Sequence, residues 1–394
     1  MSTSKDSTNV AAAPVGNQTA TSSALQMEVL QELPTSSEII EGWRSLTDNP
    51  MSGPDWLMPW WDNYSTTSDT LQLITFTNQG QLVALAPLYL ENGQDFKLLG
   101  SGKVCSDHSE LLIGDSTSVT QAESLLLDWL TSDQAPQWRS LQLEAIDSDS
   151  QTVKITGQWN GKLSVCDQPG EPSCSIELPS DWDEYLKSLS KNHRKRVRRW
   201  TRQHLESEQV QRRSTTSGWN LEEAYECLVH LHNLRRSVLT EKGAFESEQF
   251  SKFHRDAFQR LAQQEQAAIS AILIDDKPIA VEYELMNRDT VFAYQSGVDI
   301  NRDELSSPGS ISVLVRLQSA ITAGRKTFDL MRGDEDYKSH WKAERAITRN
   351  IIIWPRNRTG DIARLKYHTK RTLRSTARSA KDYVKGLLKK FKKS

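Results

Sequence analysis

Short hydrophobic runs bounded by polar turn residues occur in two separate parts of the chain, and they have the length of β-strands. Six strands are predicted from them, three in each part: 71–76, 82–90 and 96–99, then 268–274, 279–286 and 291–297. In each part a loop, an amphipathic helix and one more strand follow. The sequence therefore predicts two tandem copies of one α/β unit, with largely antiparallel strands before a βαβ-like end. Chance similarity between the strand patterns is the alternative.

Hydrophobic positions that recur at spacings of three and four predict the helices. These are 39–46, 122–130, 221–239, 249–263, 311–323 and a short one at 335–342. A single helix is predicted over 182–200, with Ser180 as its N-cap and Asp183 three residues later. Further strands are predicted at 111–113, 140–144, 162–166 and 327–331. The domain organisation follows: a leader at 1–25, two α/β domains at 26–175 and 176–355, and a tail at 356–394.

Composition excludes several classes of protein. Of the 394 residues, 37% are hydrophobic and 25% are charged, yet 12 Trp exclude a wholly disordered chain. The longest apolar runs, 82–90 and 351–354, fall short of the about 20 residues that span a bilayer. Four scattered cysteines without metal-ligand spacing exclude a disulfide scaffold and a zinc module, so no metal is predicted. The leader lacks the apolar segment of a secretory signal, which predicts a cytoplasmic protein.

Two basic segments suggest partners. The tail carries fourteen Lys or Arg against two Asp, and hydrophobic residues recur along it at helical spacing. A basic amphipathic helix of this kind suits an anionic membrane surface, on the inner face of the membrane, with non-specific nucleic-acid binding as the rival. The second segment, 191–202, carries seven Lys or Arg. We expect these side chains to form a solvated helix face that pairs with carboxylates of the same chain. The alternative is that they bind a nucleic acid or a polyanionic saccharide.

Common catalytic motifs are absent: the chain has no G-x-S-x-G, no phosphate loop G-x-x-x-x-G-K-[ST], no H-E-x-x-H and no G-x-G-x-x-G. The loop Ser307-Pro308-Gly309-Ser310 opens a predicted helix, where unpaired backbone N–H groups can bind a pyrophosphate. A plain helix N-cap is the alternative.

Several stretches in this order resemble the CelD/BcsL family of GNAT-type acyltransferases, which is associated with bacterial cellulose and exopolysaccharide synthesis. They are 54–64 with its paired tryptophans, 86–89, 98–101, Ser106-Asp107-His108, 189–199, 231–235, 242–245, 297–299, 307–309, 328–333 and 337–341. The family is similar in architecture to the Fem-type aminoacyl transferases, which pair two GNAT-like domains. This chain lacks the Q/R-x-x-G-x-G/A pyrophosphate loop of ordinary GNAT members.

The resemblance implies tandem GNAT-like domains and acyl transfer from acyl-CoA, with acetyl-CoA as the expected donor, to a hydroxyl or amine of a saccharide or cell-envelope precursor. The acyl thioester would lie between strands 291–297 and 327–331, and its carbonyl would be polarised by a strand N–H. Alternative functions are a Fem-like transferase that uses aminoacyl-tRNA and a catalytically idle scaffold of a polysaccharide synthesis complex.

The site residues that the resemblance implies fall into three groups. The catalytic candidates are Asp299, Asp329, Tyr337, Lys338 and His232. The donor-binding candidates are Ser307, Gly309, Ser310, Val291 and Gly297, and the substrate-binding candidates are Asp107, His108, Arg235 and Trp341. Either Asp299 or Asp329 would be the general base, Lys338 would stabilise negative charge, and Tyr337 would protonate the leaving group. The structural alternatives are a turn Asp, an exposed Lys, a packing Tyr and a core His.

Overall fold

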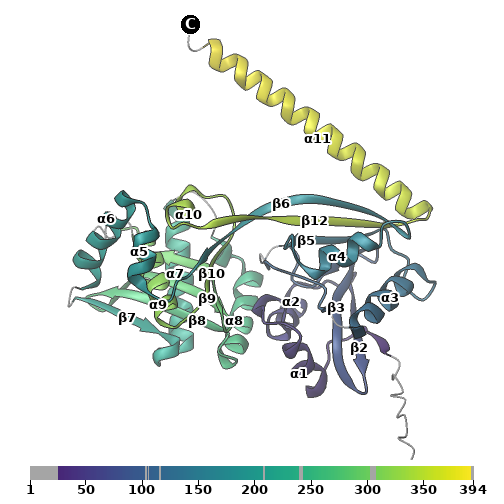
Figure 1. Ribbon diagram of the computed structural model, residues 1–394, viewed down its shortest axis with the longest axis horizontal. Coiled ribbons are helices and arrows are strands. Elements are labelled where there is room, and N and C mark those ends of the chain that lie inside the picture. The colour runs from purple at the N-terminus through teal and green to yellow at the C-terminus, as the bar shows by residue number, and fades with distance from the viewer. Residues whose placement is uncertain are drawn as a thin grey trace, which may run out of the picture.

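A twelve-stranded mixed sheet runs through the described part of the chain in the computed structural model (Figure 1). The structure describes residues 25–102, 104, 106–114, 117–206, 209–238, 243–301 and 308–391. The strands are β1 (Gln26–Leu30), β2 (Thr70–Asn78), β3 (Gln81–Glu91), β4 (Asp95–Leu98), β5 (Ser140–Ile146), β6 (Leu163–Glu177), β7 (Val210–Ser214), β8 (Ala267–Ile274), β9 (Lys277–Met286), β10 (Thr290–Val298), β11 (Thr327–Arg332) and β12 (Glu344–Pro355). Their order across the sheet is β1-β2-β3-β4-β5-β12-β6-β11-β10-β9-β8-β7.

The strand pairing repeats between the two halves of the chain. In the first half, β1 to β4 pair in antiparallel fashion and β5 then joins β4 in parallel. In the second half, β7 to β10 follow the same antiparallel order and β11 joins β10 in parallel. The predicted α/β class, with two copies of one unit and mostly antiparallel strands, is therefore confirmed.

Each half completes its sheet with a long strand from the other. After the first half, β6 extends until its end pairs with β11 of the second half. After the second half, β12 returns along β6 and its end pairs with β5. Figure 1 shows the two strands as a long ribbon that joins the halves. The predicted domain boundary between residues 175 and 176 falls inside β6 and stays a prediction.

Helices cover both faces of the sheet. They are α1 (Ser37–Ser45), α2 (Pro54–Tyr64), α3 (Thr117–Thr131), α4 (Gln151–Gln158), α5 (Trp182–Ser188), α6 (Lys191–Trp200), α7 (Leu221–Val238), α8 (Glu248–Gln263), α9 (Pro308–Thr322), α10 (Asp336–His340) and α11 (Arg358–Phe391). In the second half, α7 and α8 share one hydrophobic core with α2, whereas α5, α6 and α9 share another core on the opposite face. The core formed by α2, α7 and α8 thus holds the two halves together. In it, Trp56 packs edge-on against Phe253, with 4.8 Å between the ring centroids.

The helix predicted over 182–200 is broken in two. Asp181, not Ser180, caps α5, and Leu189 adopts an extended conformation. The Ser190 side chain then accepts the His193 N–H and starts α6. The predicted apolar stripe still reaches one core, because Leu186, Val197 and other members of it are buried together.

Other elements were not predicted from the sequence. The strand predicted at 162–166 coincides with the start of β6, whereas α4 and the rest of β6, which contains Pro169 and Pro172, were not predicted. Within the described residues, β6 pairs with β12 alone along 163–172, so prolines without an N–H are tolerated on the other edge. Residues 111–113 make a single bridge, Leu112 to Leu85, in place of a strand. Strands β1, β7 and β12 were not predicted either.

The basic tail is helical, as predicted, and Figure 1 shows α11 projecting from the body. Near its start, Ile362 is 46% exposed and Leu365 is 69% exposed. The leader and the side chains of the stripe from Ala377 to Phe391 lie outside what the structure describes. None of the described helices combines the length and the apolar character that crossing a membrane requires.

Candidate active site

A cavity of about 290 Å³ lies between the two halves, beside the paired segments of β10 and β11. The two strands pair from Thr290 with Thr327 to Phe292 with Asp329, and no further pair follows among the described residues. The first half supplies the loop residues that line the cavity, including His108, Glu110 and Asp147, and the second half supplies Asp329 and Phe292. We call this cavity the His108 cavity.

His108 is held between two carboxylates, one from each half. Its Nδ1 lies 2.8 Å from Oδ2 of Asp147, and its Nε2 lies 3.1 Å from Oδ2 of Asp329. The second distance is that of an ion pair, although its geometry is not that of a hydrogen bond. The Asn49 side chain donates to the His108 carbonyl at 2.9 Å, and His108 itself has a positive φ of 57°. The ring is therefore fixed by side chains and by a constrained backbone.

The charges in this cavity are set by burial and by neighbouring groups. Burial lowers the pKa of His108, but the carboxylates of Asp147 and Asp329 outweigh it and hold the pKa well above its ordinary value. The ring is therefore an imidazolium at neutral pH. Burial, together with the charge of Asp147, raises the pKa of Glu110 to about 7. A carboxyl with such a pKa can accept and return a proton near neutral pH, which suits a general base.

The bend of β11 next to the cavity is braced by charged groups. The Asp107 side chain is 2% exposed and forms an ion pair with the Arg332 guanidinium. The backbone N–H of Arg332 also donates to the Asp107 carboxylate at 2.8 Å. The Asp329 carboxylate accepts the Met331 N–H at 2.6 Å, and Met331 has a positive φ of 63°. Lys338 donates to the carbonyls of Met331 and Arg332 at 3.1 and 3.0 Å. The Lys338 ammonium thus stabilises the bend of β11, where three predicted site residues meet.

The loop that carries His108 is anchored to both halves. The Trp56 indole N–H donates to Ser106 at 2.9 Å, and the Tyr294 hydroxyl donates to the Val104 carbonyl. Because Trp56 comes from α2 and Tyr294 from β10, the loop has a fixed position relative to the parting strands. Such preorganisation is what an active site requires.

The structure therefore brings together Asp107, His108 and Asp329, with Lys338 close by. Asp107 and His108 lie in a loop, and the side chains of both reach β11. Glu110, Asp147 and Arg332 were missed as site residues. The position of Glu110, two residues after His108, was the available signal for it.

A second group of predicted residues lies four residues further along β10. His232 is 3% exposed, and its Nδ1 lies 3.0 Å from the Ser296 carbonyl oxygen. Burial lowers the pKa of His232, so the ring is neutral at pH 7. Arg235 donates to the Ser296 hydroxyl at 3.2 Å. A Cβ at Gly297 would come within 2.5 Å of the His232 backbone nitrogen, so the close packing of β10 on α7 accounts for this glycine.

The remaining predicted residues are dispersed. Asp299 accepts the Asn301 N–H at 3.0 Å, as a turn residue does. Tyr337 is 44% exposed, whereas Trp341 is 1% exposed. The Trp341 ring packs in a core against His193, with 4.7 Å between the ring centroids. The substrate-binding role predicted for Trp341 therefore finds no support in this geometry, and the role of Asp299 stays a prediction.

The predicted donor loop is described in part. Ser307 lies outside the described residues, whereas Gly309 and Ser310 form part of the first turn of α9. Apart from its chain neighbours and the backbone of its own helix, no atom of the described residues lies within 4 Å of the position that a Gly309 Cβ would occupy. Val291 is 6% exposed and faces the core under α9. The described residues thus leave the space beside Gly309 open.

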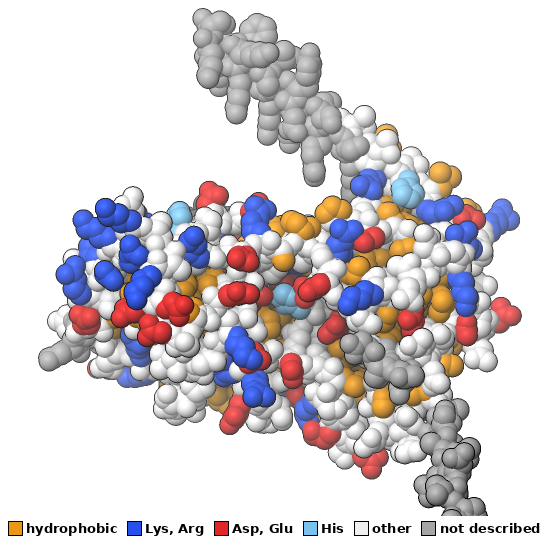
Figure 2. Space-filling view, in the orientation of Figure 1, with side chains coloured by type: hydrophobic (Ala, Val, Ile, Leu, Met, Phe, Trp, Pro, Cys, Tyr) orange, Lys and Arg blue, Asp and Glu red, His pale blue; other side chains and the backbone are white. Residues whose placement is uncertain are grey.

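The basic segment 191–202 differs from its expected interpretation. No described carboxylate lies within ion-pair distance of its Lys191, Lys195, Arg196, Arg198, Arg199 or Arg202. Figure 2 shows Lys and Arg side chains gathered at the left end of the molecule, over α5 and α6. The prediction that intramolecular carboxylates neutralise this face was therefore wrong for the described residues.

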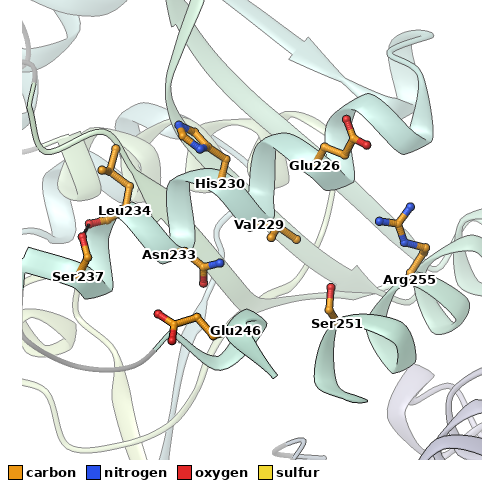
Figure 3. A pocket seen from close by; sticks show the side chains of 9 residues that line it. All are labelled: Glu226, Val229, His230, Asn233, Leu234, Ser237, Glu246, Ser251 and Arg255. Carbon is orange, nitrogen blue, oxygen red and sulfur yellow. Dashed lines mark hydrogen bonds between the residues drawn. The ribbon is translucent and has the colours of Figure 1, made fainter. Parts of the chain in front are cut away.

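A larger hollow, of about 620 Å³, lies between α7 and α8 and is open to solvent. Figure 3 shows Asn233 of α7 directed toward Glu246, with Glu226 and His230 further along the same helix. None of the predicted site residues lines this hollow.

Among the described residues, no group of three or more His, Cys, Asp or Glu is arranged to hold a metal ion. The His108 cavity remains the candidate active site.

Comparison with known proteins agrees with this geometry. Residues 191–339 match the family of acetyltransferase (GNAT) domains. Residues 191–339 therefore form a GNAT-type domain, and the protein is an acyltransferase. No curated protein matches the chain significantly.

Solved structures extend the similarity over both halves. FemX aligns with a TM-score of 0.58 at 10% identity, covering 79% of this chain and 95% of FemX, which shows a shared fold. The C-terminal domain of a putative lysylphosphatidylglycerol synthetase from Agrobacterium fabrum aligns at 0.48 and 10% identity, covering 86% of this chain and 97% of its own. A tandem GNAT protein from the clavulanic acid biosynthesis pathway aligns at 0.40 and 12% identity, covering 84% and 97%. The finer resemblance to the CelD/BcsL family stays a prediction.

Proposed function

We propose that this protein transfers an acyl group, acetyl in the simplest case, from acyl-CoA to a hydroxyl or amine of a saccharide or cell-envelope precursor, in synthesis of an exopolysaccharide of the cellulose type. The reacting centre in this proposal is the His108 cavity. One observation carries it: a carboxyl with a pKa of about 7, Glu110, and the half-buried His108 ring line the same cavity, beside the last pair of β10 and β11.

In the proposed reaction, Glu110 takes the proton from the acceptor hydroxyl or amine as its oxygen or nitrogen bonds to the acyl carbon. The charge that develops on the carbonyl oxygen is stabilised by the His108 imidazolium and by a backbone N–H of the parted strands. The carbon–sulfur bond then breaks, and the thiolate leaves with the proton that Glu110 returns. Glu110 ends as it began, and the acceptor carries the acyl group.

The other residues support this centre in different ways. Asp147 and Asp329 keep His108 charged, and Lys338 positions the bend of β11. The open first turn of α9 at Gly309 and Ser310 is proposed to bind the phosphates of the donor. The prediction that Asp299, Tyr337 or His232 acts in the reaction is kept as an alternative location of the centre.

Calorimetric titration of the full chain with acetyl-CoA tests the donor. Saturable binding is expected, and Gly309→Val is expected to weaken it about 10-fold or more because a branched side chain would crowd the phosphates. Equal affinity in Gly309→Val would contradict the donor placement, and absence of binding would contradict the donor itself.

A second function, transfer from aminoacyl-tRNA, is favoured by one observation, the basic face of α6, for which the described residues provide no carboxylate in ion-pair distance. The same titration with transfer RNA distinguishes it, because phosphate contacts give an affinity that falls steeply with salt. Binding of RNA without acetyl-CoA would make this function the better one. Binding of neither would favour an idle scaffold in a synthesis complex.

We further propose that the protein acts in the cytoplasm, on the inner face of the membrane. The basic charge of α11 and its exposed Ile362 and Leu365 support contact with anionic lipids.

A further inference from the structure

A cavity of about 470 Å³ lies between α9 and the sheet face formed by β7, β8 and β9. It shares no lining residue with the His108 cavity. Small side chains on both sides, among them Ala268 and Ala320, keep the helix from filling the space. Its size falls within the range of about 300–1,000 Å³ that is usual for small-molecule sites.

A buried guanidinium with a free N–H lines this cavity. Arg316 is 7% exposed, and its Nε and Nη1 donate to Glu284 and Glu282, each at 2.7 Å. Ser312 donates to the other oxygen of Glu282 at 2.5 Å. The Arg316 Nη2 is buried and has no hydrogen-bond partner within the described part of the chain. An unsatisfied buried N–H is costly, which makes this atom a candidate for contact with a ligand.

The other charged groups of the lining leave one cation without a partner. Arg213 pairs with Asp276 at 3.2 Å, and Arg325 donates to the Arg288 carbonyl at 2.8 Å. Arg212 has no partner among the described residues, and it lies where the cavity adjoins a second, outer hollow. The exposed Ser319 lies at the same junction. The outer hollow is also lined by Glu206, so the polar entrance to the apolar space carries the Arg212 guanidinium and one carboxylate.

We propose that this cavity binds a monoanionic amphiphile of the medium-chain carboxylate class. The carboxylate accepts N–H groups from Arg212 and from Nη2 of Arg316, while the chain lies along Val315, Ala320 and Met286. Charge-assisted hydrogen bonds to arginine select the anion over a neutral analogue, and the apolar lining supplies the remaining affinity. This site is independent of the proposed acyl transfer.

Titration calorimetry of the full chain with decanoate and with decanol tests the proposal. Decanoate is expected to bind saturably and at least about 10-fold more tightly than decanol, because the alcohol lacks the charge. Arg212→Met is expected to reduce decanoate affinity to that of decanol. The control Arg198→Met removes an equal charge from the exposed face of α6 and is expected to change neither affinity.

A second variant tests the location of the binding site without removing a charged group. Ser319→Trp places a large side chain at the entrance, at an exposed position where folding tolerates it, and is expected to weaken both ligands. Absence of saturable decanoate binding to the unaltered protein overturns the proposal. Equal decanoate affinity in Arg212→Met, or equal binding of decanoate and decanol, overturns it as well.

Discussion

Replacing Glu110 by Gln should make the protein more stable at alkaline pH while it removes the proposed base. Burial and the charge of Asp147 raise the pKa of Glu110 from 4.5 to about 7 in the folded chain. The folded state therefore binds the proton more tightly than the unfolded state does. Stability from this group is highest in acid and falls as pH rises from about 4.5 to about 7. Above pH 7 the half-buried carboxylate is ionised and lowers the free energy of unfolding.

The size of the effect follows from the shift. Each pKa unit corresponds to about 1.4 kcal/mol, so the penalty at pH 8 is about 3 kcal/mol, while at pH 5 it is below about 1 kcal/mol. Gln cannot ionise, and Glu110→Gln should escape the penalty. The free energy of unfolding of the variant, relative to the unaltered protein, should rise by about 2 to 3 kcal/mol between these two pH values.

Urea unfolding at pH 5 and pH 8 measures this difference. Glu144→Gln, at an exposed position of β5, is the matched control for the change of carboxylate to amide and should show no such rise. If the difference between Glu110→Gln and the unaltered protein is the same at both pH values, the carboxyl is not perturbed, and its proposed role as a base near neutral pH fails.

Three further predictions concern other parts of the molecule. Arg332→Met leaves the buried Asp107 carboxylate without its ion pair and should lower the free energy of unfolding by about 3 to 5 kcal/mol. The double variant with Asp107→Asn should recover most of that loss in urea unfolding. If it does not, the ion pair does not stabilise β11. Gly297→Ala forces a Cβ within 2.5 Å of the α7 backbone and should lower the free energy of unfolding by about 3 kcal/mol. Gly309→Ala, where the described residues leave space for a Cβ, should leave the free energy of unfolding unchanged or raise it by up to about 1 kcal/mol. Equal melting temperatures of the two variants would contradict the packing of β10 on α7. Deleting residues 373–394, which spares the contact of Tyr367 with Trp354, should abolish co-sedimentation with anionic liposomes at low salt, and persistent co-sedimentation would place membrane binding elsewhere.

The repeated α/β unit could be predicted from the sequence because its strands and helices depend on local patterns. The break at Leu189 could not be read from the continuous apolar stripe, although Ser190 was available as a cap. For β6, Pro169 and Pro172 indicated a loop, since the strand depends on pairing with the distant β12. Local pattern carries no information on such pairing.

The candidate site was predictable in part for the same reason. Asp107, His108 and Asp329 were named from a resemblance, but nothing local indicated that they meet: Asp107 and Arg332 are 225 positions apart. The perturbed Glu110 depends on burial between the two halves, which the sequence does not display. Gly297 was assigned to the donor, and the packing of α7 that requires a glycine there became visible in three dimensions.

The rate of acyl transfer in site variants tests the central claim most directly. Release of free thiol from acetyl-CoA, in the presence of saccharide acceptors, would be measured for the unaltered protein, Glu110→Gln, His108→Gln and Asp299→Asn. Loss of a general base or of a charge at the reacting centre should lower turnover about 10²-fold or more in the first two variants. Asp299→Asn, which changes a turn residue, should stay within a few-fold of the unaltered rate. Near-normal turnover in Glu110→Gln and His108→Gln, with loss in Asp299→Asn, would contradict the location of the active site in the His108 cavity.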